Sequence, residues 1–455
     1  MLQRNNEQTR PDKGIVRTMP DKAHTPRNRK AFQNPKGTRD FYPEDLLKRR
    51  YIESVWRRVA LRHGFDEIDG PTFEHLDLYT VKSGEGIVSE LFSFTRHGGD
   101  ETYALRPEFT PTLARMYAAR AKQLPVPTKW FCIPNFFRAE RPQRGRLREF
   151  LQWNVDAIGG DDSALMDAEL IECVAGSLEA FGLTHDDARI CASDRAQLEN
   201  FVSTSSPSAD CSAVFALLDK RAKLPDDEFA KQASAISFDI SQFDGILREK
   251  LDSLIGGLLA DNPWVVPDSS IVRGLAYYTG TVFEIIADGE RAIAGGGRYD
   301  NLIELMGGPP TPPTPAVGFA MGDVVLANLL EDKGLMPEGR DLLDALDEPV
   351  PTRCEAFVIP NGSEEAEAAL APTLAQLRKG EREAGSVSTW AHRPVHARRS
   401  YKATRNVGKL LKEANAVHAK YAVILESGEH ATVQNLDTKE KHENVSLDKI
   451  ASKLI

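Results

Sequence analysis

Helical spacing marks the first well-patterned stretch of the chain, which begins at Pro43. Apolar residues recur there at intervals of three and four until Gly64. This spacing predicts a long amphipathic helix that ends at that glycine. The following residues, Phe65–Asp69, predict a strand that leads to Gly70-Pro71.

Short apolar runs between turn residues predict strands further along. Leu91–Phe94 and Tyr103–Leu105 are predicted to be neighbouring strands joined by the polar turn Arg96–Glu101. Trp130–Asn135 predicts another strand. Residues 136–157 predict two antiparallel strands joined by a loop rich in proline, glycine and arginine.

A β-branched and aromatic run, Thr281–Ile286, predicts a strand that is followed by the glycine-rich segment Ala294–Gly297. We expect the second segment to return beside the first through a hairpin. That arrangement places Arg273, two tyrosines and three glycines around one cleft, where missing Cβ atoms let the backbone approach a ligand. Taken alone, the glycines also fit a simple turn between edge strands.

The remaining patterns predict a helical region, a linker and a small α/β domain. Residues 194–268 show helical spacing, which includes the segment Phe243–Leu259. Glu331–Pro351 is acidic and weakly patterned, as expected of a linker. Beyond it, alternating patterns predict a mixed sheet with helices. The predicted strands are Cys354–Ile359, Val387–Ala391, Tyr421–Leu425 and Val433–Leu436, and the helices are Ser363–Lys379 and Ala403–Ala419.

Three motifs resemble those of one enzyme family. The first, from Phe137, reads Phe-Arg-Ala-Glu-Arg-Pro-Gln-Arg-Gly-Arg-Leu-Arg-Glu-Phe. The second, from Arg273, reads Arg-Gly-Leu-Ala-Tyr-Tyr-Thr-Gly, and the third, from Ala294, reads Ala-Gly-Gly-Gly-Arg-Tyr-Asp-Asn-Leu. They resemble motif 2 and the two signature sequences of histidyl-tRNA synthetases. The helix and strand after Pro43 resemble motif 1 of class II aminoacyl-tRNA synthetases, which builds the dimer interface in that class.

The resemblance implies an α+β architecture with three parts. Residues 1–34 would be a flexible basic extension, because they lack the apolar surface needed to offset the entropy of ordering. Residues 35–345 would form a class II antiparallel-sheet catalytic domain with a helical insertion at about 194–268. Residues 350–455 would form a C-terminal α/β anticodon-binding domain. The family also implies a homodimer.

The implied activity is that of a histidine--tRNA ligase, which makes histidyl-adenylate from histidine and ATP, with Mg²⁺ carried by ATP, and transfers it to tRNA(His). Attack of a carboxylate on the α-phosphorus joins two anions, so cations are needed where charge develops. Arg138 is the candidate that bridges the histidine carboxylate and the α-phosphate, and by resemblance Arg273 also acts at the α-phosphate. Glu140 would accept from the adenine amine, Phe150 would stack on the purine, and Arg146 would approach the outer phosphates.

A second set of candidates would bind histidine. Prolines on both sides restrict Glu108 and Thr110, whose oxygens are potential acceptors for an ammonium group. The alternative is a helix N-cap with a dipole-stabilising glutamate. Gln152 and Asp156 are four residues apart, so they share one face of a strand. The resemblance implies that Glu108 and Thr110 bind the α-amino group of histidine and that Gln152 binds its backbone. It also implies that Asp156 and Tyr278 bind the imidazole. Tyr277 would lie beside them in the same pocket.

One segment departs from the family pattern. The motif 3 sequence Gly318-Phe-Ala-Met-Gly-Asp-Val-Val has Val325 where the family has an arginine that binds the γ-phosphate. The alternative function is a non-catalytic, synthetase-like regulatory subunit of ATP phosphoribosyltransferase. Such subunits lack the anticodon domain and usually lose ligand residues, so the retained residues favour the enzyme. Gln143, in the motif 2 loop, is a candidate contact for the tRNA acceptor end.

Composition and net charge indicate in which compartment the protein works and how it could bind tRNA. The 455 residues are 41% hydrophobic and contain no apolar run long enough to span a membrane. A net charge of −10 means that tRNA must meet local basic patches, for which residues 136–150 and 391–420 are candidates. Five cysteines without a Cys-x-x-Cys pair predict reduced thiols in the cytoplasm and no structural zinc.

Overall fold

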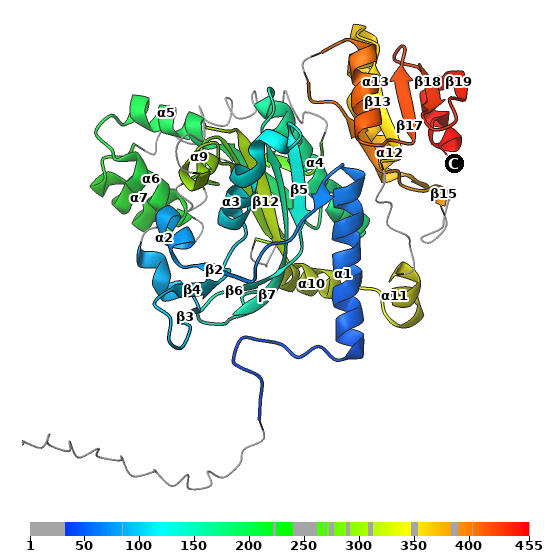
Figure 1. Ribbon diagram of the computed structural model, residues 1–455. Helices are drawn as coiled ribbons and strands as arrows, with labels where there is room; N and C mark the ends of the chain where they lie inside the picture. The colour runs from blue at the N-terminus through cyan, green and yellow to red at the C-terminus, as the bar shows by residue number, and fades with distance from the viewer. Residues whose placement is uncertain are drawn as a thin grey trace, which may run out of the picture. The chain divides into compact units, whose positions relative to one another are not determined.

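The architecture comes from a computed structural model, which describes residues 32–83, 85–221, 224–239, 262–268, 270–272, 277–287, 292–307, 313–346, 354–383, 390–402 and 404–454. The described residues from Lys36 onward form one compact unit, which is separate from the residues before them. The unit from Lys36 onward contains all the sheets that the structure describes (Figure 1). No helix in these ranges is long and apolar enough to cross a membrane.

A nine-stranded, mostly antiparallel sheet forms the centre of this unit. Its order is β1-β5-β7-β12-β11-β10-β8-β9, with β6 paired to β7, and only the two outer pairs β1/β5 and β8/β9 are parallel. The strands are β1 (Asp66–Glu67), β5 (Thr128–Cys132), β6 (Asn135–Phe137), β7 (Glu149–Ile158), β8 (Arg189–Asp194), β9 (Val265–Pro267), β10 (Thr281–Ile286), β11 (Ala294–Arg298) and β12 (Ala316–Gly322).

The two predicted hairpins of this sheet are confirmed. β10 pairs antiparallel with β11, and β6 pairs antiparallel with β7 across the arginine-rich loop. The predicted strand at Phe65–Asp69 is shorter in the structure, since β1 contains only Asp66 and Glu67. A separate three-stranded sheet consists of β2 (Phe73–His75), β4 (Thr102–Leu105) and β3 (Ser93–Thr95), which confirms the predicted pairing across Arg96–Glu101.

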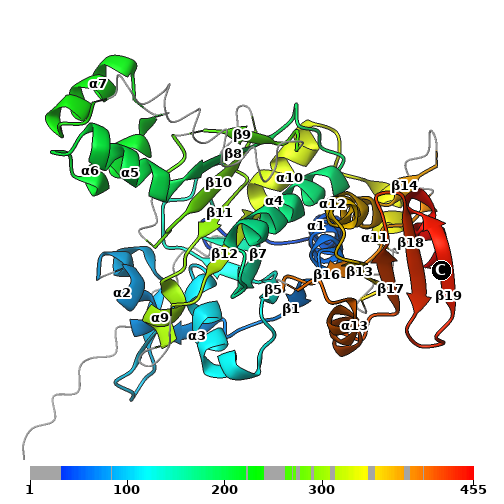
Figure 2. The same ribbon diagram turned by 90° about the horizontal axis from the view of Figure 1, so that it is seen from above.

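One face of the large sheet is covered by three helices, α1 (Pro43–Arg62), α4 (Ser163–Ala180) and α10 (Asp323–Asp332) (Figure 2). Pro43 starts α1, and Gly64 follows its end with φ +76°, a conformation that favours glycine. Trp56 of α1 stacks on Trp153 of β7, with ring centroids 6.0 Å apart. The predicted first helix is therefore confirmed, and it is part of the core.

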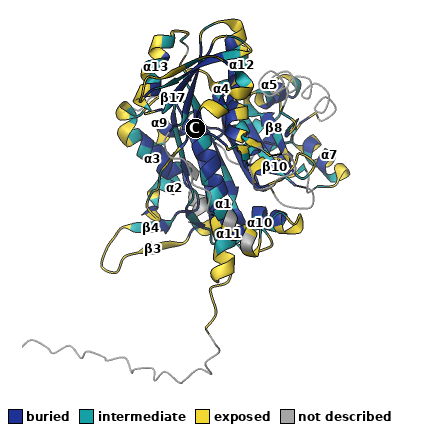
Figure 3. Ribbon diagram, turned by 90° about the vertical axis from the view of Figure 1, so that its right-hand side faces the viewer, coloured by how far each residue is buried: buried dark blue, intermediate teal, exposed yellow. Residues whose placement is uncertain are grey.

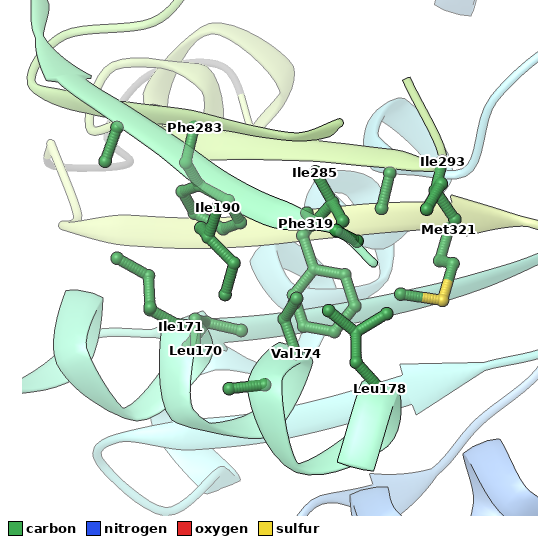
Figure 4. Packing of buried hydrophobic residues seen from close by; sticks show 14 of the residues in the cluster. Leu170, Ile171, Val174, Leu178, Ile190, Phe283, Ile285, Ile293, Phe319 and Met321 are labelled. Carbon is green, nitrogen blue, oxygen red and sulfur yellow. The ribbon is translucent and has the colours of Figure 1, made fainter. Parts of the chain in front are cut away.

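The main hydrophobic core lies between the sheet and these helices. Leu170, Ile171, Val174 and Leu178 of α4 pack against Ile190 of β8, Phe283 and Ile285 of β10, Ile293, and Phe319 and Met321 of β12 (Figure 4). The strands there are buried, whereas exposed residues gather on the outer helices and loops (Figure 3). On β7 the core residues are odd-numbered, from Leu151 to Ala157, so the even-numbered side chains face the other side of the sheet.

That other side carries α2 (Asp77–Ser83), α3 (Thr110–Arg120) and α9 (Leu302–Gly307). The region predicted to be helical contains α5 (Arg195–Ser205), α6 (Cys211–Leu218) and α7 (Asp226–Ala235). The side chain of Asp194 caps α5 by accepting from Gln197 N at 2.8 Å. β9, however, belongs to the large sheet, so the described helices end before residue 265. The predicted helix Phe243–Leu259 lies outside the described residues.

A second sheet near the C-terminus has the order β16-β13-β17-β18-β19, with two parallel and two antiparallel pairs. This confirms the predicted mixed sheet. Its elements are β13 (Ala356–Pro360), α12 (Glu364–Lys379), β16 (Ala397–Arg399), α13 (Val407–Ala416), β17 (Tyr421–Leu425), β18 (His430–Asn435) and β19 (Lys441–Ser446), with the small pair β14 (Glu381–Arg382) and β15 (Trp390–His392).

Three predictions for the C-terminal region were wrong in detail. The helix predicted at Ala403–Ala419 starts only at Val407, where the Asn406 side chain caps it. The strand β19 was missed, because its polar residues show no apolar alternation. The proposed linker contains the helix α11 (Gly339–Leu346), which packs against α1. Part of the predicted strand at Val387–Ala391 lies outside the described residues.

Candidate active site

A cavity of about 830 Å³ opens on the face of the large sheet opposite α4. Nine of the eleven predicted site residues line it. They are Glu108, Thr110, Arg138, Arg146, Phe150, Gln152, Asp156, Tyr277 and Tyr278. Glu140 is not among the lining residues, and Arg273 lies outside the described residues. Segments far apart in the sequence therefore meet at one site.

The alternation of side chains along β7 explains how this strand forms one wall of the cavity. Phe150, Gln152, Asn154 and Asp156 are alternate residues, and all four line it. The residues between them belong to the core under α4. One strand thus presents a row of polar and aromatic side chains to a ligand while its other face is packed. The predicted shared face of Gln152 and Asp156 is confirmed.

Asp156 is the most deeply buried carboxylate of the cavity wall, with 6% of its surface exposed. Tyr299 donates a hydrogen bond to its Oδ1 at 2.5 Å. Gly318 lies opposite it on β12, where an added Cβ would stand 2.0 Å from that same oxygen. The carboxylate therefore needs both a phenol as donor and a glycine as neighbour. Burial raises the pKa of Asp156 to about 7, although the Tyr299 hydrogen bond lowers it.

This pKa leads to a prediction for Asp156→Asn. An unfolded aspartate titrates near 4, so between pH 4 and 7 the folded protein binds a proton that the unfolded chain has lost, and stability falls as pH rises. The asparagine does not titrate and still accepts from Tyr299. We expect the variant to match the wild type at pH 4 and to exceed it at pH 8, by at most about 4 kcal/mol. Urea unfolding of both proteins at several pH values measures the difference, and equal pH dependence contradicts the assignment.

The glycine run of β11 has a packing role that the sequence did not indicate. Only Gly295 lines the cavity. A Cβ on Gly296 would stand 2.5 Å from the Gly318 carbonyl oxygen, and a Cβ on Gly297 would stand 2.8 Å from the Tyr278 ring. The prediction that all three glycines lie around the ligand cleft is thus corrected. Two of them allow strands and aromatic rings to approach closely.

The next residue, Arg298, is buried and fully engaged inside the protein. Its Nη2 donates to Asp167 Oδ1 at 2.6 Å and to the Ser163 carbonyl at 2.6 Å, and its Nη1 donates to Asp300 Oδ1 at 3.1 Å. Asp167 also accepts from Thr281 Oγ1 at 2.7 Å. These bonds connect β10 and β11 to α4, so the arginine holds the hairpin in place.

Glu108 and Thr110 lie at the start of α3. The helix begins at Thr110, its N-cap residue is Phe109, and no side chain caps it by a hydrogen bond. The N-cap alternative for this pair is therefore not supported. Behind them, Glu74 Oε1 accepts from Thr112 Oγ1 at 3.2 Å and from Arg115 Nη2 at 2.5 Å. That pair of bonds fixes α3 against β2.

Arg138 reaches the cavity from the end of β6. Its Nε donates to the Pro107 carbonyl at 3.1 Å, and its guanidinium lies 5.1 Å from the centroid of the Phe150 ring. Burial lowers the pKa of this arginine, while the carboxylates of Glu108 and Glu140 raise it. The group stays charged, since an arginine pKa starts above 12. It is therefore a preorganised cation at the edge of the aromatic surface.

The motif 2 loop contributes Arg146 to the cavity. Its Nη1 lies 2.5 Å from Glu140 Oε2, so the carboxylate predicted to bind adenine is paired with the arginine predicted to bind phosphate. The roles of both residues stay predictions. Val324 and Val325 at the start of α10 add apolar surface to the lining of the cavity.

Sequence reasoning missed four residues of this site. Asn154 and Glu284 both line the cavity, and the period of their strands would have revealed them. Tyr299 stands in the third motif, but its partner is 143 positions away. Gly318 has no local signal, because its importance depends on which strand lies beside β12.

Comparisons with known proteins agree with this geometry. A sequence model of the family described as histidyl-tRNA synthetase matches residues 37–234 and 189–324, which cover more than half of the chain. The chain belongs to the histidyl-tRNA synthetase family. The predicted family and its class II α+β fold are confirmed.

Individual relatives show how far the similarity extends. The histidine--tRNA ligase of Opitutus terrae is 41% identical over 338 residues, which cover 67% of this chain and 76% of that protein. The histidine--tRNA ligase of Pyrococcus horikoshii is 34% identical over 461 residues, which cover 93% and 98%. The solved histidyl-tRNA synthetase of Nostoc sp. PCC 7120 shares the fold, with a TM-score of 0.55, 21% identity and coverage of 94% and 99%.

Proposed function

We propose that this protein is a histidine--tRNA ligase, which activates histidine with ATP and transfers it to tRNA(His). Two observations support the proposal. Histidine--tRNA ligases are similar to this chain over most of their length. The cavity also brings together acceptors for an ammonium group, a buried carboxylate and a cation next to an aromatic ring.

In the first step a carboxylate oxygen of histidine attacks the α-phosphorus of ATP, the bond between the α-phosphorus and the bridging oxygen breaks, and pyrophosphate leaves. We assign Arg138 to the point where both anions meet, because it lines the cavity and its planar fork suits carboxylate and phosphate together. Because its position is fixed before substrates arrive, it stabilises the developing charge without reorganisation. We also assign Arg273 to the α-phosphate, by its place in the family signature.

Histidine selection follows from the buried Asp156. The carboxylate is held by Tyr299 and has Tyr278 across the same cavity. A side chain without imidazole nitrogens would leave these polar groups unpaired, which costs more than a missing apolar contact. Glu108 and Thr110 would accept from the α-amino group, and Gln152 would bind the histidine backbone.

The ATP end is aromatic and basic. Phe150 would stack on the purine. Glu140 would accept from the purine amine once Arg146 leaves it and turns to the outer phosphates. Mg²⁺ would enter with ATP as the counter-ion of these phosphates. Val325 offers no charge on the facing wall. The proposal therefore relies on Arg146 of the motif 2 loop for the outer phosphates.

Residues 350–455 are proposed to bind the anticodon. Arg399, Lys402, Arg405, Lys409 and Lys412 provide positive charge on β16, the following loop and α13. We expect deletion of residues 350–455 to spare histidine-dependent pyrophosphate exchange and to weaken tRNA charging. Exchange and charging assays on the truncated chain measure this, and survival of full charging contradicts the assignment. Gln143, in the motif 2 loop at the cavity, is a candidate contact for the acceptor stem of the tRNA.

An exposed aromatic cluster supports the proposed homodimer. Phe73, Phe94 and Tyr103 of the three-stranded sheet have ring centroids 5.6–5.9 Å apart, and Phe73 and Phe94 are 48% and 42% exposed. Aromatic patches left open on one chain are typical of protein interfaces. We expect Phe94→Glu to shift the protein toward the monomer in analytical ultracentrifugation. The control Leu305→Glu, at an exposed position on α9, should stay dimeric.

One experiment separates the ligase from a regulatory subunit of ATP phosphoribosyltransferase. The purified protein is given ATP, Mg²⁺ and each of the twenty amino acids in turn, and pyrophosphate exchange is measured. The proposal requires exchange with histidine alone. No exchange, or exchange with another amino acid, would overturn it.

The five cysteines are free thiols, in keeping with the cytoplasmic location that we propose.

A further inference from the structure

A single carboxylate connects two walls of the ATP end of the cavity. Asp323 is the first residue of α10 and is 3% exposed, and the residues around it, Gly322 and Val324, line the cavity. Its Oδ1 accepts from the backbone N of Leu151 at 3.0 Å. Leu151 lies on β7 between Phe150 and Gln152, which also line the cavity. The position of α10 relative to β7 therefore depends on this buried group.

The counter-charge of Asp323 comes from Arg39, 284 positions earlier in the chain. Arg39 Nη2 lies 2.6 Å from Asp323 Oδ2, and the two side chains are 30% and 4% exposed. Burial raises the pKa of Asp323, and Arg39 and the Leu151 hydrogen bond lower it. A carboxylate this deeply buried needs such a partner to stay ionised. Phe41 supports the arginine, with its ring centroid 4.9 Å from the guanidinium carbon.

The segment that carries Arg39 is itself attached to the motif 2 hairpin. The Gly37 carbonyl accepts from the backbone N of Arg148 at 2.8 Å and of Glu149 at 3.2 Å. Gly37 has φ +90°, and a Cβ there would stand 2.6 Å from Pro142. Residues 36–41 thus connect the hairpin at one end to α10 at the other.

We propose that Arg39 is a positioning residue for ATP, which acts by holding Asp323 and, through it, the start of α10 against β7. The pair does not line the cavity. It sets the distance between the Phe150 side, where the purine would stack, and the apolar wall formed by Val324 and Val325. That wall carries Val325 in place of the arginine of the family's motif 3 pattern, so its placement depends on the ion pair behind it. The inference rests on the proposed activation of histidine by ATP.

The test measures pyrophosphate exchange by the full-length wild type and by Arg39→Met, with KM determined separately for ATP and for histidine. We expect KM for ATP to rise roughly tenfold and KM for histidine to change less than about twofold. The KM of Arg39→Lys for ATP should lie between those of the wild type and Arg39→Met, since lysine keeps the charge but not the planar fork. The double variant Arg39→Met/Asp323→Asn should recover part of the loss, because it also removes the unpaired carboxylate. Arg50→Met, at an exposed arginine of α1, is the control.

Several results would overturn the inference. One is an unchanged KM for ATP in Arg39→Met, and another is an equal rise of both KM values, which indicates a general loss of structure. If Arg39→Met does not fold, the inference requires the double variant to fold and to show the selective rise in KM for ATP; without that rise it fails. A wild type that lacks histidine-dependent exchange refutes the proposed function instead.

Discussion

Replacement of Arg138 by alanine is expected to slow histidine-dependent pyrophosphate exchange by roughly a hundredfold to a thousandfold. The side chain is fixed by the Pro107 carbonyl and by the Phe150 ring before any substrate binds. In the proposed role, its charge is therefore in place when the α-phosphate gains negative charge in the transition state. Because the interaction grows during the reaction, kcat should fall more than KM rises.

Two further variants test whether the slower exchange of Arg138→Ala comes from the lost donor geometry or from the lost charge. Arg138→Lys keeps the charge but presents no planar pair of donors, so it should recover only part of the rate. Arg144→Ala removes an exposed arginine of the same loop, which pairs with Asp332 at 3.2 Å, and should leave the rate nearly unchanged. Near-normal exchange by Arg138→Ala, measured with saturating ATP and histidine, would remove Arg138 from the reaction.

The part of this site that the sequence predicts is the part encoded by local patterns. The hairpin of β10 and β11 follows from a β-branched run and a glycine-rich return, and both strands are found as expected. The shared face of Gln152 and Asp156 follows from the two-residue period of a strand. Motif resemblance then supplied their roles, which periodicity alone does not give.

The remaining features depend on contacts between distant segments. Gly318 matters because β12 pairs with β7 in a register that places it opposite Asp156, and no local pattern fixes that register. Arg39 and Asp323 are 284 positions apart, in segments that each look ordinary. The sequence predicts that the glycines of β11 contact a ligand, because it does not reveal that strands and rings crowd two of them.

The second large effect is expected at a buried charge cluster between the catalytic sheet and the C-terminal domain. Glu169 of α4 contacts two cationic side chains, Lys129 of β5 and Arg378 of α12, and the imidazole of His63 after α1. Glu169 and Arg378 are 5% and 4% exposed. Burial alone would raise the pKa of Glu169, yet Arg378 and Lys129 hold it well below its usual range.

Arg378→Met is therefore expected to lower the free energy of unfolding by about 3–5 kcal/mol, the usual effect of removing one partner from a buried ion pair. Urea unfolding measures it. Arg393→Met removes a more exposed pair with Glu355 in the same domain and should cost at most about 1 kcal/mol.

The same cluster makes stability depend on pH. Burial and the charge of Arg378 lower the pKa of His63 to about 4. An unfolded histidine titrates near 6.5, so between pH 6.5 and 4 the unfolded chain binds a proton that the folded protein does not, and stability falls as pH falls. His63→Asn should remove this component, because the asparagine oxygen still accepts from Arg378, which lies 3.1 Å from His63 Nδ1. An unaltered slope over this range would show that His63 is not the group that titrates.

Deletion of the whole C-terminal domain should perturb Glu169 less than Arg378→Met does. Methionine leaves the carboxylate buried with one cation fewer, whereas the deletion removes the covering helix and exposes Glu169 to water, which restores its solvation. We therefore expect the truncated chain to keep Glu169 ionised beside Lys129 and to retain exchange, even though Arg378→Met in the full chain is strongly destabilised. A point variant that is as stable as the wild type would show that the cluster does not attach the domain.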